Sequence, residues 1–167
     1  MPTEPKIKIV DNPLIRVEID NLYETTNQVL LAKWSLSIAK HILLIVGIDY
    51  KSVDVIMEGF EVNELWQSGN ARMHDVRQSG FKVHKLARET ENEIHKIALR
   101  VVGQAVGSGH MREHSMVASD YAIKLIGLLY ENDLDAISTE RTWQLHELQK
   151  IIKSNDYKTT KQHQNLT

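Results

Sequence analysis

All three prolines of this chain of 167 residues lie within its first 13 positions, and the rest of the sequence contains none. An internal proline removes a backbone donor and clashes with the preceding helical turn, so a long run without proline permits uninterrupted helices. Apolar residues recur within this run at intervals of three and four, as in Leu30, Trp34, Ile38 and Ile42. The sequence therefore predicts an all-α bundle of five to six helices.

Three segments differ in pattern. Residues 1–20 contain β-branched stretches that partly alternate, which predicts an extended N-terminal arm or a short hairpin around Asp11-Asn12-Pro13. Residues 21–153 keep a helical period and predict a single all-α domain, whose last helix covers about residues 135–152. Residues 154–167 hold almost no apolar side chains, so we expect a polar, disordered tail there.

The stretch from Gly103 to Gly109 is compatible with two local structures. It is either a turn between two helices or part of one continuous helix, in which glycines allow a second backbone to approach closely. Because Val106, His110 and Val117 keep the helical phase across it, we favour the continuous helix.

Composition excludes several classes of protein. The absence of cysteine excludes a disulfide scaffold, a cysteine nucleophile and thiolate zinc sites. The net charge is −2, so we expect no nucleic-acid partner. The longest apolar run, residues 42–48, is too short to span a membrane, and the first twenty residues carry charges in place of a hydrophobic leader. We therefore expect no membrane partner and a cytoplasmic location.

Two histidines form the pattern H-x-x-E-H over residues 110–114. On one helix, His110 and His114 would lie one turn apart and could grip a metal, with Glu113 as a general base and His84 as a third ligand. A catalytic zinc needs such a third protein ligand, and no downstream motif identifies a carboxylate for that part. We favour the other reading, in which both histidines are partly buried and bonded to neighbouring polar groups.

A second candidate for metal chemistry is the dipeptide His74-Asp75. Metal-dependent phosphohydrolases named for a His-Asp dipeptide are all-α, and here His41 with Asp120 or Asp133 could complete the ligand set. This is the enzymatic alternative for the chain. The sequence contains no Glu-x-x-His pair, no glycine-rich phosphate-binding motif and no G-x-S-x-G elbow.

An acidic stripe lies on the helix expected after residue 53. Asp54, Glu58 and Glu61 are spaced i, i+4 and i+7, and Glu64 follows. Such a stripe is either ordinary solvated surface or a docking face whose charge steers a basic partner.

Several segments together resemble a known family. The matching pieces are Trp34 and His41 in KWSLSIAKHIL, Trp66 in LWQSG, Arg77, His84 and Arg88 in VRQSGFKVHKLARE, and His110, His114 and Tyr121 in GQAVGSGHMREHSMVASDYAIKLI. Over roughly residues 28–130 the chain resembles the Imm-5-like putative immunity proteins, an all-α family of bacterial toxin–immunity systems. It departs from the family at the glycines near Gly107, where the family is rich in alanine. It also departs at Lys51-Ser-Val-Asp54, where the family has an Arg-Pro-Arg-like stretch.

The resemblance implies a non-catalytic protein without a cofactor that binds and neutralises a cognate toxin inside the producing cell. The acidic stripe is compatible with a basic toxin, and the sequence leaves open whether the chain forms a homo-oligomer. The nine residues just named recur together in the family pattern. They predict a polar network that either braces the bundle or lines a ligand pocket.

Overall fold

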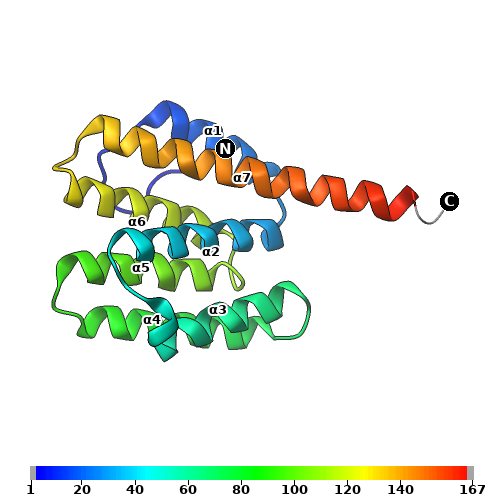
Figure 1. The fold of residues 1–167 in the computed structure, drawn as a ribbon, viewed down its shortest axis with the longest axis horizontal. Helices are drawn as coiled ribbons and strands as arrows, with labels where there is room; N and C mark the ends of the chain where they lie inside the picture. The colour runs from blue at the N-terminus through cyan, green and yellow to red at the C-terminus, as the bar shows by residue number, and fades with distance from the viewer. Residues whose placement is uncertain (1–2, 165–167) are drawn as a thin grey trace.

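A computed structural model describes residues 3–164, in which seven α-helices follow one another without a β-strand (Figure 1). The bounds are α1 Pro13–Thr25, α2 Gln28–Ile45, α3 Asp54–Gln67, α4 Met73–Glu89, α5 Glu93–Gly107, α6 Glu113–Leu129 and α7 Leu134–Gln164, with a 3-10 turn at Tyr50–Ser52. The all-α class expected from the sequence is confirmed, but the number of helices is higher than the five to six expected.

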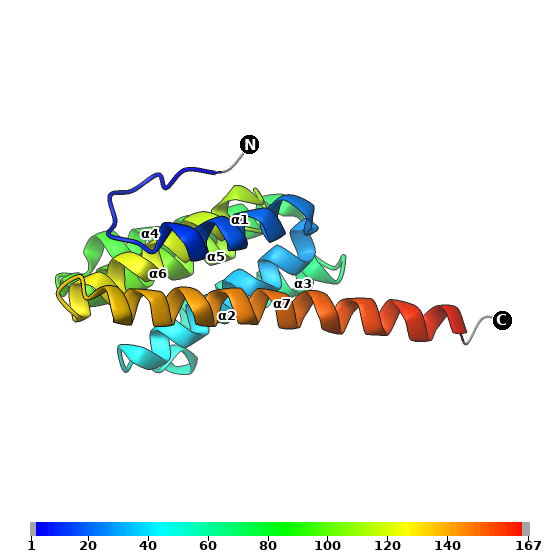
Figure 2. The same cartoon turned by 90° about the horizontal axis from the view of Figure 1, so that it is seen from above.

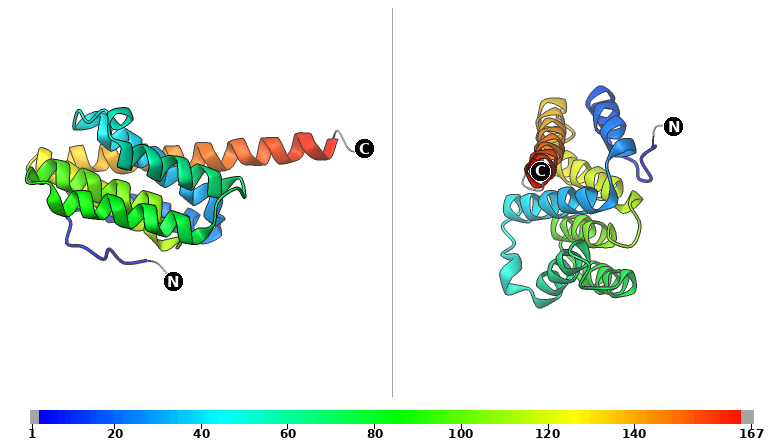
Figure 3. Two further views of the ribbon diagram at one scale, coloured as in Figure 1. Left: turned by 90° about the horizontal axis from the view of Figure 1, so that it is seen from below. Right: turned by 90° about the vertical axis from the view of Figure 1, so that its right-hand side faces the viewer.

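The helices are stacked in layers, with α2, α5 and α6 in the middle of the bundle (Figure 3). The pair α3 and α4 packs on α5 at one side, and α7 packs on α2 and α6 at the other side, next to α1. Fully buried apolar side chains of the middle helices form the centre of the core: Leu31, Ile38, Ile42, Val102, Ala105 and Ile123.

The central helix α2 is long and apolar enough to cross a membrane, judged by length and composition alone. However, 56% of it is buried inside the bundle, against α5, α6 and α7. A helix packed on several sides needs an apolar surface nearly all round, so its place in the core accounts for its composition.

The N-terminal segment is shorter than expected. Residues 3–12 are extended (Figure 2), but residues 13–20, which we expected to belong to the arm or hairpin, are part of α1. Asn12 caps this helix by accepting a bond from the backbone N–H of Ile15, and Pro13 occupies its first turn. The β-branched residues of this stretch favour an extended strand locally. However, Ile19 and Tyr23 also follow a helical period, and both are buried when the segment is a helix.

The continuous helix favoured across Gly103–Gly109 is wrong, because α5 ends at Gly107 and α6 begins at Glu113. Side chains of distant helices bond to the carbonyls that the break leaves open. Asn63 of α3 donates to Val106 O at 2.8 Å, and Gln28 of α2 donates to Ser108 O at 2.9 Å. The chain therefore gains tertiary hydrogen bonds that a continuous helix would lack.

The close approach expected from these glycines is nevertheless present. A Cβ atom placed on Gly80 of α4 would lie 3.5 Å from the carbonyl oxygen of Gly103 and 3.7 Å from the backbone nitrogen of Gly107 in α5. The small residues thus let α4 and α5 pack backbone to backbone, which offsets the helical cost of glycine.

Helix α7 is 31 residues long and projects beyond the rest of the bundle (Figures 1 and 2). Residues 154–164, which we expected to be a disordered tail, continue this helix. They contain neither glycine nor proline, so nothing in the local sequence breaks the helix although it has little to pack against. The last part of the expected tail, residues 165–167, lies outside the described residues.

Candidate functional site

The metal candidates His84 and His114 have protein partners. His84 Nδ1 lies 3.1 Å from a guanidinium nitrogen of Arg100, which must be the donor because arginine cannot accept. His114 Nδ1 lies 2.6 Å from the Gln104 side-chain oxygen, so here the imidazole donates. These bonds join α4 and α6 to α5 and occupy one ring nitrogen on each histidine.

The environment keeps both imidazoles neutral. Burial lowers the pKa of His84 to about 4, and the positive charges of Arg100, His114 and Arg88 act in the same direction. Burial also lowers the pKa of His114, with His110 as a further cause. A neutral His84 is the form that can accept the bond from Arg100, so geometry and protonation agree.

The H-x-x-E-H pattern does not lie on one helix. His110 belongs to the turn before α6, and its ring meets the ring of His114 edge to face with centroids 5.3 Å apart. Among the described side chains of residues 3–162 and 164, no group of three or more His, Cys, Asp or Glu is placed to hold a metal ion. The third-ligand role suggested for His84 is therefore not supported by the geometry.

The residues considered for a His-Asp phosphohydrolase site are bound to separate partners. His41 of α2 bonds to Glu140 of α7 at 3.0 Å, whereas Asp75 pairs with Arg72 at 2.8 Å where α4 begins. Asp120 is buried on α6 and bonds to arginines. His74 is exposed, and Asp133 bonds to the backbone N–H of Ala136.

A buried ionic cluster, which the sequence analysis missed, joins the N-terminal segment to α1, α6 and α7. The fully buried Arg141 contacts Asp11 at 2.7 Å and Asp120 at 2.8 Å. Arg16 makes two bonds of 3.0 Å to Asp120 and a third of 2.7 Å to the carbonyl of Thr3. One signal was available, because Arg141 lies midway between buried Ile137 and Leu145 in the helical phase.

Hydrogen bonds continue from this cluster to α2. Arg141 donates to Ser119 and to Gln144, whose amide in turn donates to Glu140 at 3.3 Å. The backbone carbonyl of Gln144 accepts from the indole of the fully buried Trp34 at 2.9 Å. Trp34 and His41 therefore join α2 to α7, as a bracing network would.

His41 also forms one wall of a pocket between α2, α6 and α7. Its ring stacks on Trp143 with centroids 3.8 Å apart, while its Nε2 donates to Glu140. The pocket has a volume of about 350 Å³, and apolar and aromatic side chains form most of its wall. The remaining lining residues are Ile45, Ile126, Tyr130, Ala136 and Thr139.

The other residues of the family pattern lie apart from this pocket. Trp66 packs against Gly109, where an added Cβ would lie 3.1 Å from the indole. Arg77 is exposed over the ring of Phe81, and Arg88 is exposed as well. Tyr121 is half-buried against the core. The nine residues thus fall into several groups, of which the His84–His110–His114 group and the Trp34–His41 group are the largest.

The acidic stripe lies along the exposed face of α3. All four carboxylates of Asp54, Glu58, Glu61 and Glu64 are exposed. Lys82 of α4 pairs with Glu58 at 2.6 Å, and Lys40 of α2 pairs with Glu64 at 3.2 Å. The fold therefore brings cations to the stripe that its local sequence lacks.

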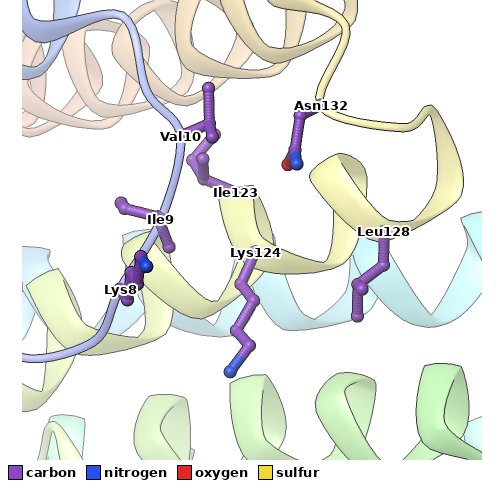
Figure 4. A pocket seen from close by; sticks show the side chains of 7 residues that line it. All are labelled: Lys8, Ile9, Val10, Ile123, Lys124, Leu128 and Asn132. Carbon is purple, nitrogen blue, oxygen red and sulfur yellow. The ribbon is translucent and has the colours of Figure 1, made fainter.

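A second hollow, with the opposite charge, lies between the N-terminal segment and α6 (Figure 4). It measures about 240 Å³, and Lys8 and Lys124 are the charged groups of its lining. Apolar side chains and one amide complete it: Ile9, Val10, Ile123, Leu128 and Asn132. The sequence offered no signal for this hollow, because its two sides are more than a hundred residues apart.

Comparisons with known proteins agree with the resemblance seen in the sequence. Residues 21–151 match the family described as Imm-5 like putative immunity protein. This match covers α2 to α6 completely, together with the end of α1 and more than half of α7. Neither the curated proteins nor the solved structures give a significant match.

Proposed function

Because this chain belongs to the Imm-5 like putative immunity protein family, we propose that it binds a cognate toxin and neutralises it inside the producing cell. The family match over residues 21–151 is the observation that carries this proposal. We place the protein in the cytoplasm, where a toxin made by the same cell would first act. Neutralisation by binding requires an exposed complementary surface and no catalytic centre.

The internal chemistry of the bundle supports a binding role. The histidines with resolved pKa shifts, His84 and His114, are neutral and bonded to Arg100 and Gln104. The buried charges of Arg141 and Asp120 form an ion pair with each other. Such groups stabilise the arrangement of helices, so contact with a partner is left to the surface.

We assign the docking face for a basic toxin to the acidic stripe on α3. Glu58 and Glu64 are held by exposed lysine pairs, which contribute about 0–1 kcal/mol each and can exchange for a partner's cations. Asp54 and Glu61 have no ion pair within residues 3–164. Negative potential along the helix would raise the rate at which a basic partner associates.

The test is co-expression with the toxin encoded beside the gene, followed by measurement of growth and of affinity. The wild-type chain should restore growth. The double substitution of Asp54→Lys and Glu58→Lys should lower both rescue and association rate, because two attractive charges become repulsive. If the double variant folds and still protects fully, the stripe is not the docking face. If the wild type gives no rescue, the immunity function itself is refuted.

A matched control changes the net charge by the same amount as the double variant but leaves the acidic stripe intact. Glu18→Lys together with Asp156→Lys changes two exposed carboxylates on α1 and α7, which lie on the other side of the bundle. This control variant should protect as well as the wild type. Equal loss in both variants would show that total charge, not the stripe, determines binding.

A further inference from the structure

One end of the bundle exposes apolar side chains that no helix covers. Leu44 at the end of α2 is 80% exposed, and Leu134 at the start of α7 is 56% exposed. Tyr130, in the turn between α6 and α7, is 54% exposed. Ile45 at the end of α2 and Tyr130 in this turn line the same pocket, so the two segments lie close together. Exposed apolar groups gathered in this way are typical of a protein-binding surface.

The pocket between α2, α6 and α7 lies beside Tyr130 at this end of the bundle. Tyr130 and Ile45 line it beside the stacked rings of His41 and Trp143. Its one acidic group is the carboxylate of Glu140, a side chain only 5% exposed. Aromatic walls around one carboxylate form a site for a cation that carries apolar substituents.

Glu140 retains capacity to bind such a cation. One oxygen accepts from His41 at 3.0 Å and the other accepts from the Gln144 amide at 3.3 Å. An ionised carboxylate offers about four acceptor sites, so these two bonds leave room for further donors. The low polarity of the pocket strengthens any charge-assisted bond formed there.

The charges around the pocket favour a positive partner. From residue 125 to residue 140 the sequence contains Glu131, Asp133, Asp135 and Glu140 but no lysine or arginine. The three carboxylates outside the pocket are exposed. A cationic partner that approaches along the turn between α6 and α7 would therefore meet carboxylates, whereas Lys40 lies beside Leu44 at the end of α2.

The turn that carries Tyr130 is held in a defined shape. Glu131 and Asn132 both have positive φ angles, 51° and 60°, which residues other than glycine rarely adopt. The backbone N–H of Asn132 donates to Gly127 O at 2.8 Å, and that of Tyr130 donates to Ile126 O at 3.0 Å. A left-handed conformation at two successive residues is the kind of strain found at binding sites.

We propose that this pocket receives a lysine or arginine side chain, with its charge on Glu140 and its aliphatic part between Tyr130 and Trp143. The identification of the toxin as the protein that supplies this side chain rests on the function proposed above. The exposed Leu134, two residues before Ala136 of the pocket lining, would bury surface next to the inserted side chain. Tryptophan, tyrosine and arginine are enriched among the interface residues that contribute most of the binding energy.

The pocket can be tested without the toxin, by NMR titration of the full chain with N-acetyl-arginine methylamide. We expect saturable shifts at the Trp143 indole and at Tyr130. Glu140→Gln should weaken binding by about tenfold or more, the factor for one lost charge-assisted bond. Glu147→Gln is the matched control, because this carboxylate of the same helix bonds to Ser37 and Lys150 outside the pocket.

Three results would overturn the inference: no saturable shift, equal binding by Glu140→Gln, or equal binding of N-acetyl-glutamate methylamide. If Glu140→Gln fails to fold, Tyr130→Ala replaces it, since Tyr130 is exposed and outside the core. Tyr130→Ala should weaken binding of the arginine derivative, and unchanged binding would count against the pocket.

The toxin measurements separate this inference from the function on which it rests. Leu134→Lys puts a positive charge at the rim and should lower rescue by the co-expressed chain, while the unfolding curve stays unchanged. Full rescue by Leu134→Lys would refute the toxin as donor of the side chain. Failure of the wild type to rescue would refute the immunity function, and the titration alone would then decide whether the pocket binds cations.

Discussion

Acidification should destabilise this protein through His84. The folded pKa of this imidazole is about 4, because it is buried and lies beside Arg100, whereas its ordinary value is 6.5. The unfolded chain therefore binds a proton at a higher pH than the folded chain does. The stabilisation is complete above about pH 6.5 and is lost as the pH falls to about 4.

The difference between these two pKa values corresponds to roughly 3 kcal/mol of unfolding free energy. This figure is an upper limit, because the ring is half-buried and solvent screens part of the interaction. A loss of this size is a large share of the stability of a typical domain, about 5–15 kcal/mol. Acid should therefore lower the stability of the chain measurably before its carboxylates are fully protonated.

The assay is urea denaturation at pH 7, 6, 5 and 4 of the wild type and of His84→Gln. Glutamine keeps an acceptor for Arg100 but cannot bind a proton in this range. The carboxylates titrate in both proteins, so the difference between their pH profiles isolates His84. The wild type should lose roughly 3 kcal/mol more than the variant at most. Parallel profiles, or a His84 resonance that titrates near its ordinary pKa, would refute this account.

Two further substitutions test the packing. Arg141→Met removes the closest cation of the half-buried Asp11 and leaves the buried Asp120 with Arg16 alone, so it should cost up to about 3–5 kcal/mol in denaturation. Lys82→Met, at the exposed pair with Glu58, should cost about 0–1 kcal/mol. Similar losses in both variants would show that burial of the Arg141 cluster adds no stability. Gly103→Ala places a Cβ atom 2.5 Å from the His84 ring, so the ring has to move. The free energy of unfolding should fall by about 1–3 kcal/mol, and the His84 NMR signals should shift. Unchanged signals would contradict the close packing of Gly103 and His84.

The helical body could be predicted because its information is local. The helix indicated by the spacing of Leu30, Trp34, Ile38 and Ile42 is present as α2, and the helix expected after residue 53 is present as α3. The exceptions depend on capping and on tertiary bonds. Asn12 turns a β-branched stretch into α1, and side chains of α2 and α3 stabilise the break after Gly107.

The candidate site was harder to predict, because most of its contacts join distant parts of the chain. Asp11 meets Arg141 across 130 positions, and His41 meets Glu140 across 99. The resemblance to the family identified His41 and Trp34 as members of a set, but it could not show that Arg77 and Arg88 face solvent. Helical periodicity shows which residues share one face of a helix, but the helix that packs against this face depends on the topology of the fold.

The link between Asp11 and Arg141 also determines when the protein can be completed during its synthesis. Asp11 is made 130 residues before Arg141, the guanidinium that lies nearest to it. Until Arg141 has emerged, Asp11 lacks this ion pair, and its segment is held by local bonds alone, such as the bond from Arg16 to the Thr3 carbonyl. A nascent chain that stops before α7 would lack this ion pair, so the N-terminal segment reaches its final stability only after α7 has been made.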